Sequence, residues 1–423
     1  MKKIFICCEG PCIKRILDAQ KISNYLYANG NKIVDSPIYA DSIIFVSCGV
    51  GNHQVNNSLS IIERFKDHDA ELIVAGCLPD IAPDKLRKAF NGKIFSTKNL
   101  EDIDNFFPEN KIKFKEIDDA NVLDGDFITG KFKEKTIFFK KLKRLNNAYI
   151  RIRKHILSNL YDRQSLIYRI LSEELTKDKS MYNLRISRGC FGNCAYCSIK
   201  KAVGTHESKP FETCINEFKK GLKMGYTFFP ITGDDIGGYG IDIKSNFPEL
   251  LDGLTSIHGD YELLIREISP FWIVKYIDDL EKIIGRYKIS HLGVALQSGS
   301  PCVLKLMNRY SDIEKIEDSI TRLRRICPNL FISIHVIVGF PTETDDDFKK
   351  TLIFIKRNKI NSGFIYVFSC NPGTKAELLE PKVTEKEMLK RIKYAKKFLK
   401  KSGYVVLYTK NPFSFIFDSR TRY

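Results

Sequence analysis

Three cysteines on one short loop constrain this chain more than any other feature. The loop reads S-R-G-C-F-G-N-C-A-Y-C, which spaces Cys190, Cys194 and Cys197 as Cys-x3-Cys-x2-Cys. Cysteine thiolates are the usual ligands of iron-sulfur clusters, and three thiolates on a four-iron cluster leave one iron open for chemistry. A zinc site would need a fourth ligand, and the nearest candidates, His206 and Cys214, lack finger-type spacing. The spacing therefore predicts a four-iron cluster with one open iron.

The cysteine loop resembles that of the radical S-adenosylmethionine (SAM) enzymes, and among these it is most similar to the methylthiotransferases. Three further motifs carry the resemblance in the same order along the chain: Ala295–Ser300, Val303–Arg309 and Ile337–Thr344. In these enzymes SAM chelates the open iron, and one electron cleaves it to methionine and a 5′-deoxyadenosyl radical. The resemblance therefore implies that the chain binds SAM and a 4Fe-4S cluster.

The first hundred residues alternate apolar runs with helical patterns, which is typical of a parallel α/β sheet. Strands are expected at 3–8, 41–47 and 71–75, with helices at 13–29 and 55–65. A cysteine follows each strand, and these are Cys12, Cys48 and Cys77. Because parallel strands have their carboxyl ends at one edge of the sheet, we expect the three cysteines at the same edge.

Two interpretations of these three cysteines stay open. A buried cysteine at a strand end is most often inert packing. The methylthiotransferase resemblance implies instead that they hold an auxiliary 4Fe-4S cluster, because the family's N-terminal cysteines match them in order. Asp18, six residues after Cys12, matches an aspartate common in the family. Cys7 and Cys8 lie within the first strand, and either one is an alternative to Cys12 as ligand.

From residue 181 to 380, strands and helices alternate again, and the resemblance implies a partial (β/α)6 barrel. Active sites of parallel barrels lie at the carboxyl ends of the strands. Residues expected at these ends, near SAM or substrate, are Gly233, Asp235, Arg266, Ser269, Gln297, Ser298, Gly339 and Phe340. Gly339 would let the backbone approach the adenine closely. Asp235 is equally compatible with a helix or turn cap, and Glu343 and Thr344 are expected as helix caps.

Four segments are expected. They are a flavodoxin-like α/β domain at 1–108, a basic linker or insertion at 109–180, the radical SAM core at 181–380, and a helical extension at 381–423. The extension is too short for the RNA-associated TRAM barrel that many methylthiotransferases carry. In the insertion, cations alternate with aromatic residues between Lys131 and His155. This pattern suits RNA phosphates, an acidic peptide or an anionic surface, but also a solvated helical face.

The formal net charge of +17 favours a polyanion such as RNA, although a lysine-rich composition alone would also raise it. Twelve cysteines, with no signal peptide and no apolar run of membrane length, predict a cytoplasmic protein without membrane insertion. Two positions depart from the family pattern after the cysteine loop: Val203 replaces an arginine, and His206 replaces a glutamate. Cys214, Cys302, Cys327 and Cys370 have no ligand-like spacing and are expected to be structural.

These features lead to one main functional hypothesis and two alternatives. The main one is a two-cluster methylthiotransferase that inserts a methylthio group at an unactivated C–H, in a tRNA anticodon-loop adenosine or a protein or peptide side chain. Flavodoxin or ferredoxin would be the reductant. One alternative is a radical SAM peptide maturase of another reaction type, with the auxiliary cluster as an electron relay. The other is a non-catalytic iron-sulfur protein that binds RNA or a partner. The sequence predicts no particular oligomeric state.

Overall fold

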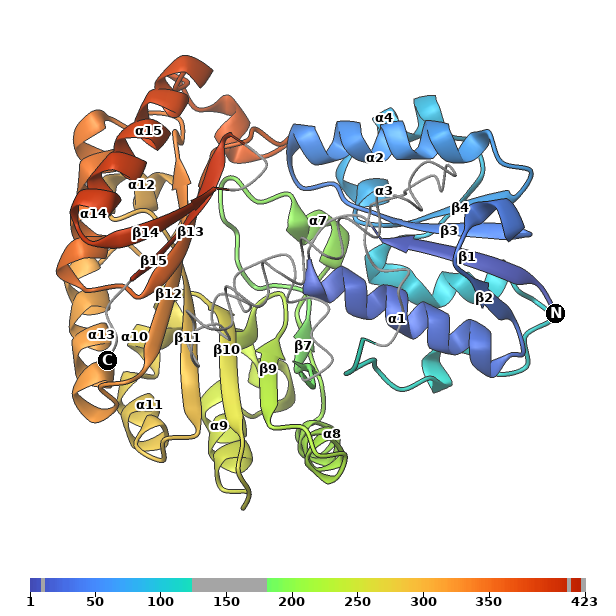
Figure 1. The fold of residues 1–423 in the computed structure, drawn as a ribbon, viewed down its shortest axis with the longest axis horizontal. Coiled ribbons are helices and arrows are strands. Elements are labelled where there is room, and N and C mark those ends of the chain that lie inside the picture. Colours follow the sequence, from blue (N-terminus) through green and yellow to red (C-terminus); the bar gives the residue numbers. More distant parts are fainter. Residues whose placement is uncertain (9–11, 124–180, 409–411, 420–423) are drawn as a thin grey trace, which may run out of the picture.

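The structure is a computed structural model that describes residues 1–8, 12–123, 181–408 and 412–419. It consists of two α/β domains that lie side by side (Figure 1). The N-terminal domain contains a five-stranded sheet, and the second domain contains an eight-stranded sheet. The basic stretch between Lys131 and His155 lies outside the described residues. No described helix has the length and apolar character needed to cross a membrane.

The N-terminal domain follows the strand–helix alternation of its sequence. Its elements are β1 (Lys3–Cys8), α1 (Ile13–Ala28), β2 (Lys32–Val34), β3 (Ser42–Ser47), α2 (Gly51–Lys66), β4 (Glu71–Gly76), α3 (Leu78–Ile81), α4 (Pro83–Ala89) and β5 (Lys93–Ile94), with 3-10 turns η1 (Pro37–Tyr39), η2 (Thr97–Asn105) and η3 (Phe114–Glu116). The strands are parallel in the order β2-β1-β3-β4-β5. This is the strand order of flavodoxin-like folds, so the predicted fold class is confirmed.

The two faces of the five-stranded sheet bury alternate residues of each strand, as the two-residue period of a strand requires. Ile4, Ile6 and Cys8 pack in the core that α1 covers, whereas Phe5 and Cys7 pack in the core that α2 covers. The helices lie on opposite faces of the sheet in Figure 1. Cys7 and Cys8 are therefore both core side chains, at 5% and 0% exposure. Cys8 is the last residue of β1, and its thiol is an electrostatic neighbour of Cys12 and Cys48.

The N-terminal domain extends beyond the boundary predicted at residue 108. Phe114, Ala120 and Leu123 are buried in the same core as α1. The Tyr25 and Phe114 rings meet edge to face, with centroids 5.6 Å apart. The sequence pattern weakens here because the segment has no regular helix or strand, and its attachment depends on scattered apolar side chains.

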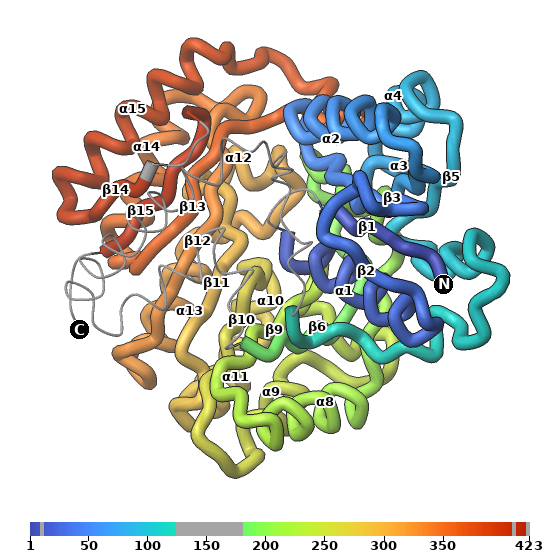
Figure 2. Tube along the Cα trace, turned by 45° about the vertical axis from the view of Figure 1, so that its right-hand side comes forward, coloured from blue at the N-terminus to red at the C-terminus, as the bar shows by residue number. Residues whose placement is uncertain are grey.

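The second domain contains the following elements: β6 (Leu184–Arg185), β7 (Ser187–Arg188), α7 (Ile199–Val203), β8 (Glu207–Ser208), α8 (Phe211–Lys223), β9 (Phe228–Thr232), η6 (Ile236–Gly238), η7 (Ile241–Ile243), α9 (Phe247–Thr255), β10 (Glu262–Ile268), α10 (Pro270–Lys275), α11 (Ile277–Ile284), β11 (Ile289–Gln297), α12 (Pro301–Leu306), α13 (Ile313–Ile326), β12 (Phe331–Val338), α14 (Asp345–Arg357), β13 (Ser362–Val367), η8 (Lys375–Leu378), α15 (Glu385–Lys401), β14 (Tyr404–Tyr408) and β15 (Ser414–Ser419). The helices lie outside the curved sheet, as Figure 2 shows.

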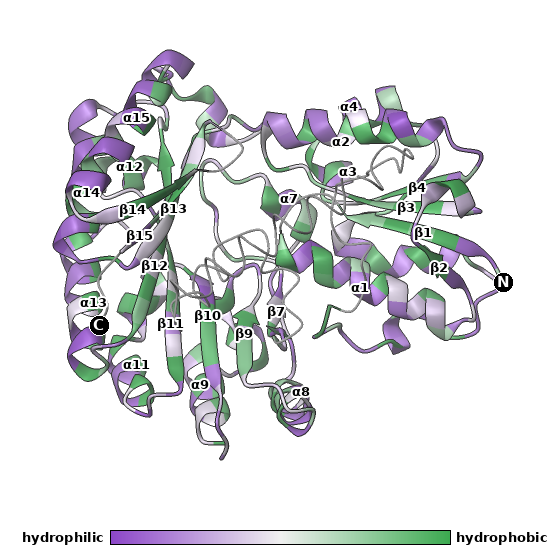
Figure 3. Cartoon of the chain, viewed as in Figure 1, coloured by the Kyte–Doolittle hydropathy of each residue, from purple (hydrophilic) through white to green (hydrophobic). Residues whose placement is uncertain are grey.

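Six strands of the second sheet are parallel neighbours in the order β6-β9-β10-β11-β12-β13. This arrangement confirms the predicted partial (β/α)6 barrel. Figure 3 shows apolar strands and helices whose outward faces are polar. One continuous hydrophobic core packs the helices against the sheet. The carboxyl ends of the parallel strands therefore form a rim on a rigid support.

The C-terminal part differs from the predicted helical extension. It contains the expected helix, α15, but the chain then returns as β14 and β15, which pair antiparallel to each other, and β15 also pairs antiparallel to β13. Phe415 and Phe417 on β15 are fully buried in the barrel core. The two strands therefore extend the barrel sheet beyond β13.

Candidate functional site

The loop with Cys190, Cys194 and Cys197 joins β7 to α7, at the carboxyl rim of the barrel. All three thiols are free and partly exposed. A Cβ atom on Gly192 would lie 3.1 Å from the Cys190 sulfur and 3.9 Å from the Cys194 sulfur. The glycine thus leaves open the space between two thiols, and any larger residue would fill it. The Gly192 N–H also donates to the Cys190 sulfur over 3.2 Å.

The charged form of two of these thiols, Cys190 and Cys197, is disfavoured. Burial and the neighbouring Asp235 carboxylate raise the pKa of Cys190 to about 12. Burial and the Cys194 sulfur raise the pKa of Cys197. A bound iron-sulfur cluster deprotonates its thiol ligands outright, since the positive irons stabilise the thiolates. The site therefore holds thiols that need a positively charged group to ionise.

The motif from Val303 to Arg309 forms hydrogen bonds with the cysteine loop. The Met307 carbonyl accepts a hydrogen bond from the Ala195 N–H over 2.9 Å, and the Asn308 side chain donates to the Asn193 carbonyl over 2.8 Å. Arg309 donates to the Cys194 sulfur over 3.4 Å. Sequence reasoning singled out this motif only as a mark of resemblance. The structure shows that it holds the backbone between the cysteines and brings a cation to one thiol.

Asp235 follows β9 and lies beside the cysteine loop. One carboxylate oxygen accepts a hydrogen bond from the Trp272 indole over 2.8 Å, and the other lies 3.8 Å from the Cys190 sulfur. Its side chain does not cap the turn that follows. Of the two interpretations offered by the sequence, the structure therefore supports a residue at the site. Gly233, two residues earlier, accepts a hydrogen bond through its carbonyl from Lys14 of the N-terminal domain.

Three of the residues expected near SAM lie on neighbouring strand ends with polar partners. Ser269 lies 3.5 Å from the Arg309 guanidinium, and Gln297 accepts a hydrogen bond from the Tyr366 hydroxyl over 3.2 Å. Arg266 on β10 is partly exposed. Burial lowers its pKa, although Glu267 and Cys12 act in the opposite direction. Arg266 therefore lies within electrostatic range of a cysteine of the other domain.

Ser298, Gly339 and Phe340 also lie at the rim but contact protein. The Ser298 hydroxyl is fully buried beside Thr351 and accepts a hydrogen bond from the Ser300 N–H. The space that a Cβ of Gly339 would occupy is filled by Met388 of α15, 2.5 Å away. Phe340 is completely buried under the cysteine loop, where its ring meets those of Tyr196 and Phe368 edge to face.

Of the two predicted helix caps, one behaves as expected. Thr344 caps α14 and forms a reciprocal capping box with Asp347. Glu343 instead accepts a hydrogen bond from the Gly339 N–H over 2.6 Å and pairs with Arg391 of α15 over 2.8 Å. Burial raises its pKa to about 7, opposed by the Gly339 N–H and the Arg391 guanidinium. Glu343 therefore joins the rim to α15.

The two positions that depart from the family pattern have different environments. His206 stacks on the ring of Phe191 within the cysteine loop, with ring centroids 4.4 Å apart, and lies 3.2 Å from the Ser208 hydroxyl. Val203 ends α7 and lines a pocket of about 260 Å³ between the domains. Arg15 and Arg188 line the same pocket. An aromatic contact to the loop is thus present at the position where a glutamate was expected.

The N-terminal cysteines all follow strand ends at the edge of the sheet that faces the barrel. Cys12 and Cys77 each precede a helix, α1 and α3, and Cys48 follows β3. The Cys77 sulfur lies 4.0 Å from both the Arg15 guanidinium and the Thr97 hydroxyl. Burial raises the pKa of Cys77, Arg15 lowers it, and Cys12 raises it, so Cys12 and Cys77 are electrostatic neighbours.

Within the described ranges, no three cysteine, histidine or carboxylate side chains converge closely enough to hold a single metal ion. A four-iron cluster has a different requirement, because each thiolate binds a separate iron. The glycine at 192 keeps any side chain out of the space between the Cys190 and Cys194 sulfurs, as such a group requires. For Cys12, Cys48 and Cys77 the structure shows three thiols at a common edge and in no disulfide, which is the donor set an auxiliary cluster needs.

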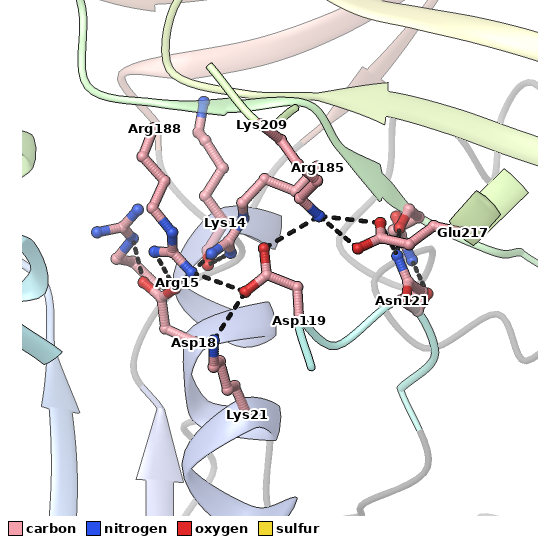
Figure 4. Close-up of polar contacts among 11 residues, drawn as sticks. Lys14, Arg15, Asp18, Lys21, Asp119, Asn121, Arg185, Arg188, Lys209 and Glu217 are labelled. Atoms are coloured by element: carbon pink, nitrogen blue, oxygen red, sulfur yellow. Dashed lines mark hydrogen bonds and ion pairs between the residues drawn. The ribbon is translucent and has the colours of Figure 1, made fainter. Parts of the chain in front are cut away.

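Charged residues from both domains meet beside the cysteine loops (Figure 4). Asp119 pairs with Lys21 of α1 at 3.2 Å, with Arg188 at 3.4 Å and with Lys209 at 3.1 Å. Lys209 also binds Glu217 at 2.7 Å. Although burial would raise the pKa of Asp119, Lys209 and the other cations hold it well below its ordinary value. Arg188 is two residues before Cys190, so the network reaches the cysteine loop directly.

Two protein families match this chain, one in each of the two domains. Residues 184–355 match the Radical SAM superfamily, and residues 3–96 match an uncharacterized protein family, UPF0004. A probable threonylcarbamoyladenosine tRNA methylthiotransferase of Pyrococcus horikoshii is 27% identical over 380 residues, covering 88% of this chain and 78% of that protein. A tRNA-2-methylthio-N(6)-dimethylallyladenosine synthase of Clostridium botulinum is 28% identical and covers 88% and 76%.

Another relative has a higher sequence identity to this chain, over a shorter stretch. The threonylcarbamoyladenosine tRNA methylthiotransferase MtaB of Thermotoga maritima is 35% identical over 222 residues, which is 51% of this chain and 50% of that protein. Among solved structures, the radical SAM methyltransferase TsrM of Kitasatospora setae aligns with a TM-score of 0.58 at 10% identity, over 92% of this chain and 76% of that one. This likeness concerns the fold of both domains together.

Proposed function

This chain belongs to the radical SAM methylthiotransferase family, and from that premise we propose that it inserts a methylthio group into a tRNA nucleoside with the help of two 4Fe-4S clusters. Enzymes of the family transfer a sulfur-containing group. The observation that carries the proposal is the meeting of the two cysteine-bearing edges. Lys14, two residues after Cys12, donates to the Gly233 carbonyl at the barrel rim and pairs with Glu267 over 3.2 Å.

Two sets of residues would hold the cofactors. Cys190, Cys194 and Cys197 would bind the cluster that holds SAM, and Cys12, Cys48 and Cys77 would bind the auxiliary cluster. When bound, the clusters and SAM supply the hydrogen-abstracting radical and the methylated sulfur, chemistry that side chains alone cannot perform. The protein's own contribution is to orient the SAM, the substrate carbon and the sulfur, and to exclude water.

Three rim residues are proposed to orient SAM. Asp235 is fixed by Trp272 beside Cys190 and presents a carboxylate to a bound amine. Ser269 and Gln297 offer a hydroxyl and an amide on adjacent strand ends. Arg266 is proposed to face the space between the domains, because its charge interacts with that of Cys12. In this assignment Ser298, Gly339 and Phe340 support the rim and do not touch the ligand.

The charge distribution supports an RNA substrate. Five exposed lysines follow one face of α15 at spacings of three or four residues, namely Lys386, Lys390, Lys393, Lys397 and Lys401. The opposite face buries Ile392, Ala395 and Leu399 in the barrel core. A row of cations on one helix face suits the phosphates of a polynucleotide. Because Met388 packs on Gly339, this helix starts at the rim.

The mass of the product tests the proposal. The anaerobically reconstituted protein is incubated with SAM, reductant and total tRNA, and the digested nucleosides are analysed by mass spectrometry. We expect one adenosine derivative to gain a sulfur atom and a methyl group in place of hydrogen. A crosslinked or epimerised peptide product would support a peptide maturase, and SAM binding without turnover would support a non-catalytic iron-sulfur protein.

Salt dependence tests the nature of the substrate separately. If α15 contacts phosphates, tRNA affinity should fall steeply between low and moderate salt, and exchanging Lys390, Lys393 and Lys397 for glutamine should reduce that slope. A matched control exchanges Lys219, Lys223 and Lys282, exposed lysines on α8 and α11. An absence of tRNA binding by the unmodified protein at low salt would favour a protein or peptide side chain instead.

A further inference from the structure

Near each of the three N-terminal cysteines, a separate contact reaches the loop that carries Cys190, Cys194 and Cys197 or the residues directly before and after that loop. The contacts come from different parts of the chain and use different chemistry: an ion-pair cluster, a bridging amide and an apolar patch. Two sites within one protein need such contacts only if their relative position matters, because each domain has a separate hydrophobic core.

The first contact is the ion-pair cluster around Asp18. Its side chain is 1% exposed and pairs with Arg185 at 2.6 Å and Arg188 at 2.9 Å, both from the second domain, and with Arg15 of its own helix at 3.3 Å. Arg185 also donates to the carbonyl of Lys14. Figure 4 shows the guanidinium groups converging on α1. Helix α1 starts directly after Cys12, so Asp18 connects that cysteine to the backbone just before Cys190.

The second contact is the Asn371 side chain, which lies on the loop after β13. Its carbonyl oxygen accepts a hydrogen bond from the Gly51 N–H over 2.8 Å, and its amide donates to the Tyr196 carbonyl over 3.2 Å. Gly51 is three residues after Cys48, and Tyr196 immediately precedes Cys197. Asn371 is only 7% exposed. One buried amide thus connects a cysteine loop of each domain.

The third contact is apolar. Cys77, Ile81 and Ala202 form a small buried cluster, with Ile199 packed against it. Cys77 directly precedes α3, Ile81 is the last residue of α3, and the other two residues lie on α7, which begins two residues after Cys197. The third N-terminal cysteine is therefore packed directly on the helix that follows the cysteine loop.

We propose that Asp18 and Asn371 are positioning residues that set the separation and orientation of the two cysteine sites. The inference rests on the proposed function, because a reaction that joins a substrate carbon to a sulfur held at the other site requires a set distance. A displacement of about 1 Å between reacting groups can cost about a hundredfold in rate. Neither residue needs to touch SAM or substrate for this role.

The test compares Asp18→Asn and Asn371→Leu with the unmodified protein, after reconstitution. Both variants should keep two clusters and should cleave SAM at a similar rate. We expect the magnetic dipolar coupling between the two reduced clusters, measured by pulsed electron paramagnetic resonance, to weaken or broaden. The yield of methylthiolated product per SAM cleaved should fall about tenfold or more. Asn371→Asp keeps the acceptor for the Gly51 N–H and should retain an intermediate yield.

Two controls separate positioning from stability. Glu317→Ala removes an ion pair with Arg357 at 2.7 Å and the acceptor of a hydrogen bond from the Asn358 amide at 2.8 Å, all within the second domain. This variant should lose stability without changing the coupling or the yield. If the Asp18 and Asn371 variants keep the wild-type coupling and yield, the positioning role is wrong.

Hydrogen exchange gives a second measurement that does not depend on the clusters. The Gly51 amide should exchange faster in Asn371→Leu because it loses its acceptor, and amides of the cysteine loop should exchange faster in Asp18→Asn. If the unmodified protein holds only one cluster, the two-cluster function is wrong. Hydrogen exchange still shows whether Asp18 and Asn371 hold the two domains together. Unchanged exchange at both places would overturn the inference even if the proposed function holds. Should Asp18→Asn fail to fold, Asp18→Glu replaces it.

Discussion

The guanidinium of Arg309 lies 3.4 Å from the sulfur of Cys194 and equally far from the hydroxyl of Tyr196. Its other nitrogen approaches Ser269 and the Ala295 carbonyl. The arginine therefore places a partly buried positive charge beside the middle cysteine of the loop. Hydrogen bonds and charges beside the sulfur ligands are among the features that set the reduction potential of an iron-sulfur cluster.

Replacing Arg309 by methionine should make the cluster on this loop harder to reduce, because the variant loses a cation and a donor to sulfur. We expect the midpoint potential to fall by about 60 mV or more, which is a tenfold change in the equilibrium for a one-electron couple. A redox titration followed by electron paramagnetic resonance measures it. Arg309→Lys keeps the charge and should shift the potential less. Equal potentials in all three proteins would contradict this role.

The two sets of cysteines should differ in which half of the reaction they support. Cys194→Ala should abolish SAM cleavage, whereas Cys48→Ala should keep cleavage and lose insertion of the methylthio group. Iron content measures the assignment independently. About eight irons per chain should fall to about four when Cys12, Cys48 and Cys77 are all replaced by alanine, as two four-iron clusters require. Cys302→Ala is a suitable control, since that thiol is exposed and far from either set in sequence.

Alanine at Gly339 should destabilise the protein for two reasons. The residue has a φ of +82°, and its Cβ would lie 2.5 Å from the Met388 side chain. The left-handed conformation alone costs about 1–2 kcal/mol for a residue with a Cβ. Gly30→Ala is the matched control, because Gly30 has a φ of +78° and no atom within 4 Å of its Cβ position. Urea unfolding should show a larger loss for Gly339→Ala than for Gly30→Ala.

Acid should weaken the contact between the domains, because protonation of Asp18 removes its ion pairs with Arg185 and Arg188. Burial alone would raise the pKa of this carboxyl, but Arg15, Arg185 and Arg188 outweigh it and hold the pKa well below the ordinary value of 3.8. A carboxyl with a lowered folded pKa contributes stability that is present above its unfolded pKa and is lost as the pH falls through the folded pKa. The difference in unfolding free energy between the unmodified protein and Asp18→Asn should therefore be largest above about pH 4 and shrink below it. A difference that stays constant with pH would contradict the assignment.

The strand–helix alternation was sufficient to predict the two α/β domains, the strands β1, β3 and β4 with the helices α1 and α2, and the sheet edge that the N-terminal cysteines share. These features depend on local periodicity, which a sequence displays directly. The partners of the key polar residues could not be predicted in the same way. Arg185 and Asp18 are 167 residues apart, and Asn371 and Gly51 are 320 residues apart. Only the packing of the two domains brings them together.

The direction in which a side chain points at a strand end could not be predicted from the sequence either. Ser298 and Gly339 occupy the predicted ends, yet one faces Thr351 and the other is covered by Met388. The pattern gives the position along a strand, whereas the orientation depends on helices α14 and α15. The hairpin of β14 and β15 left a signal that was missed, because Tyr404–Tyr408 and Ser414–Ser419 are rich in β-branched and aromatic residues.

The same hairpin has a consequence for how the polypeptide is made. Until Ser414–Ser419 has left the ribosome, β13 remains an unprotected edge strand, with a row of backbone donors and acceptors and the apolar face of Ile365 open to other chains. Such edges recruit further strands and lead to aggregation. A nascent chain would thus expose this edge strand from the moment β13 emerges until β15 pairs with it.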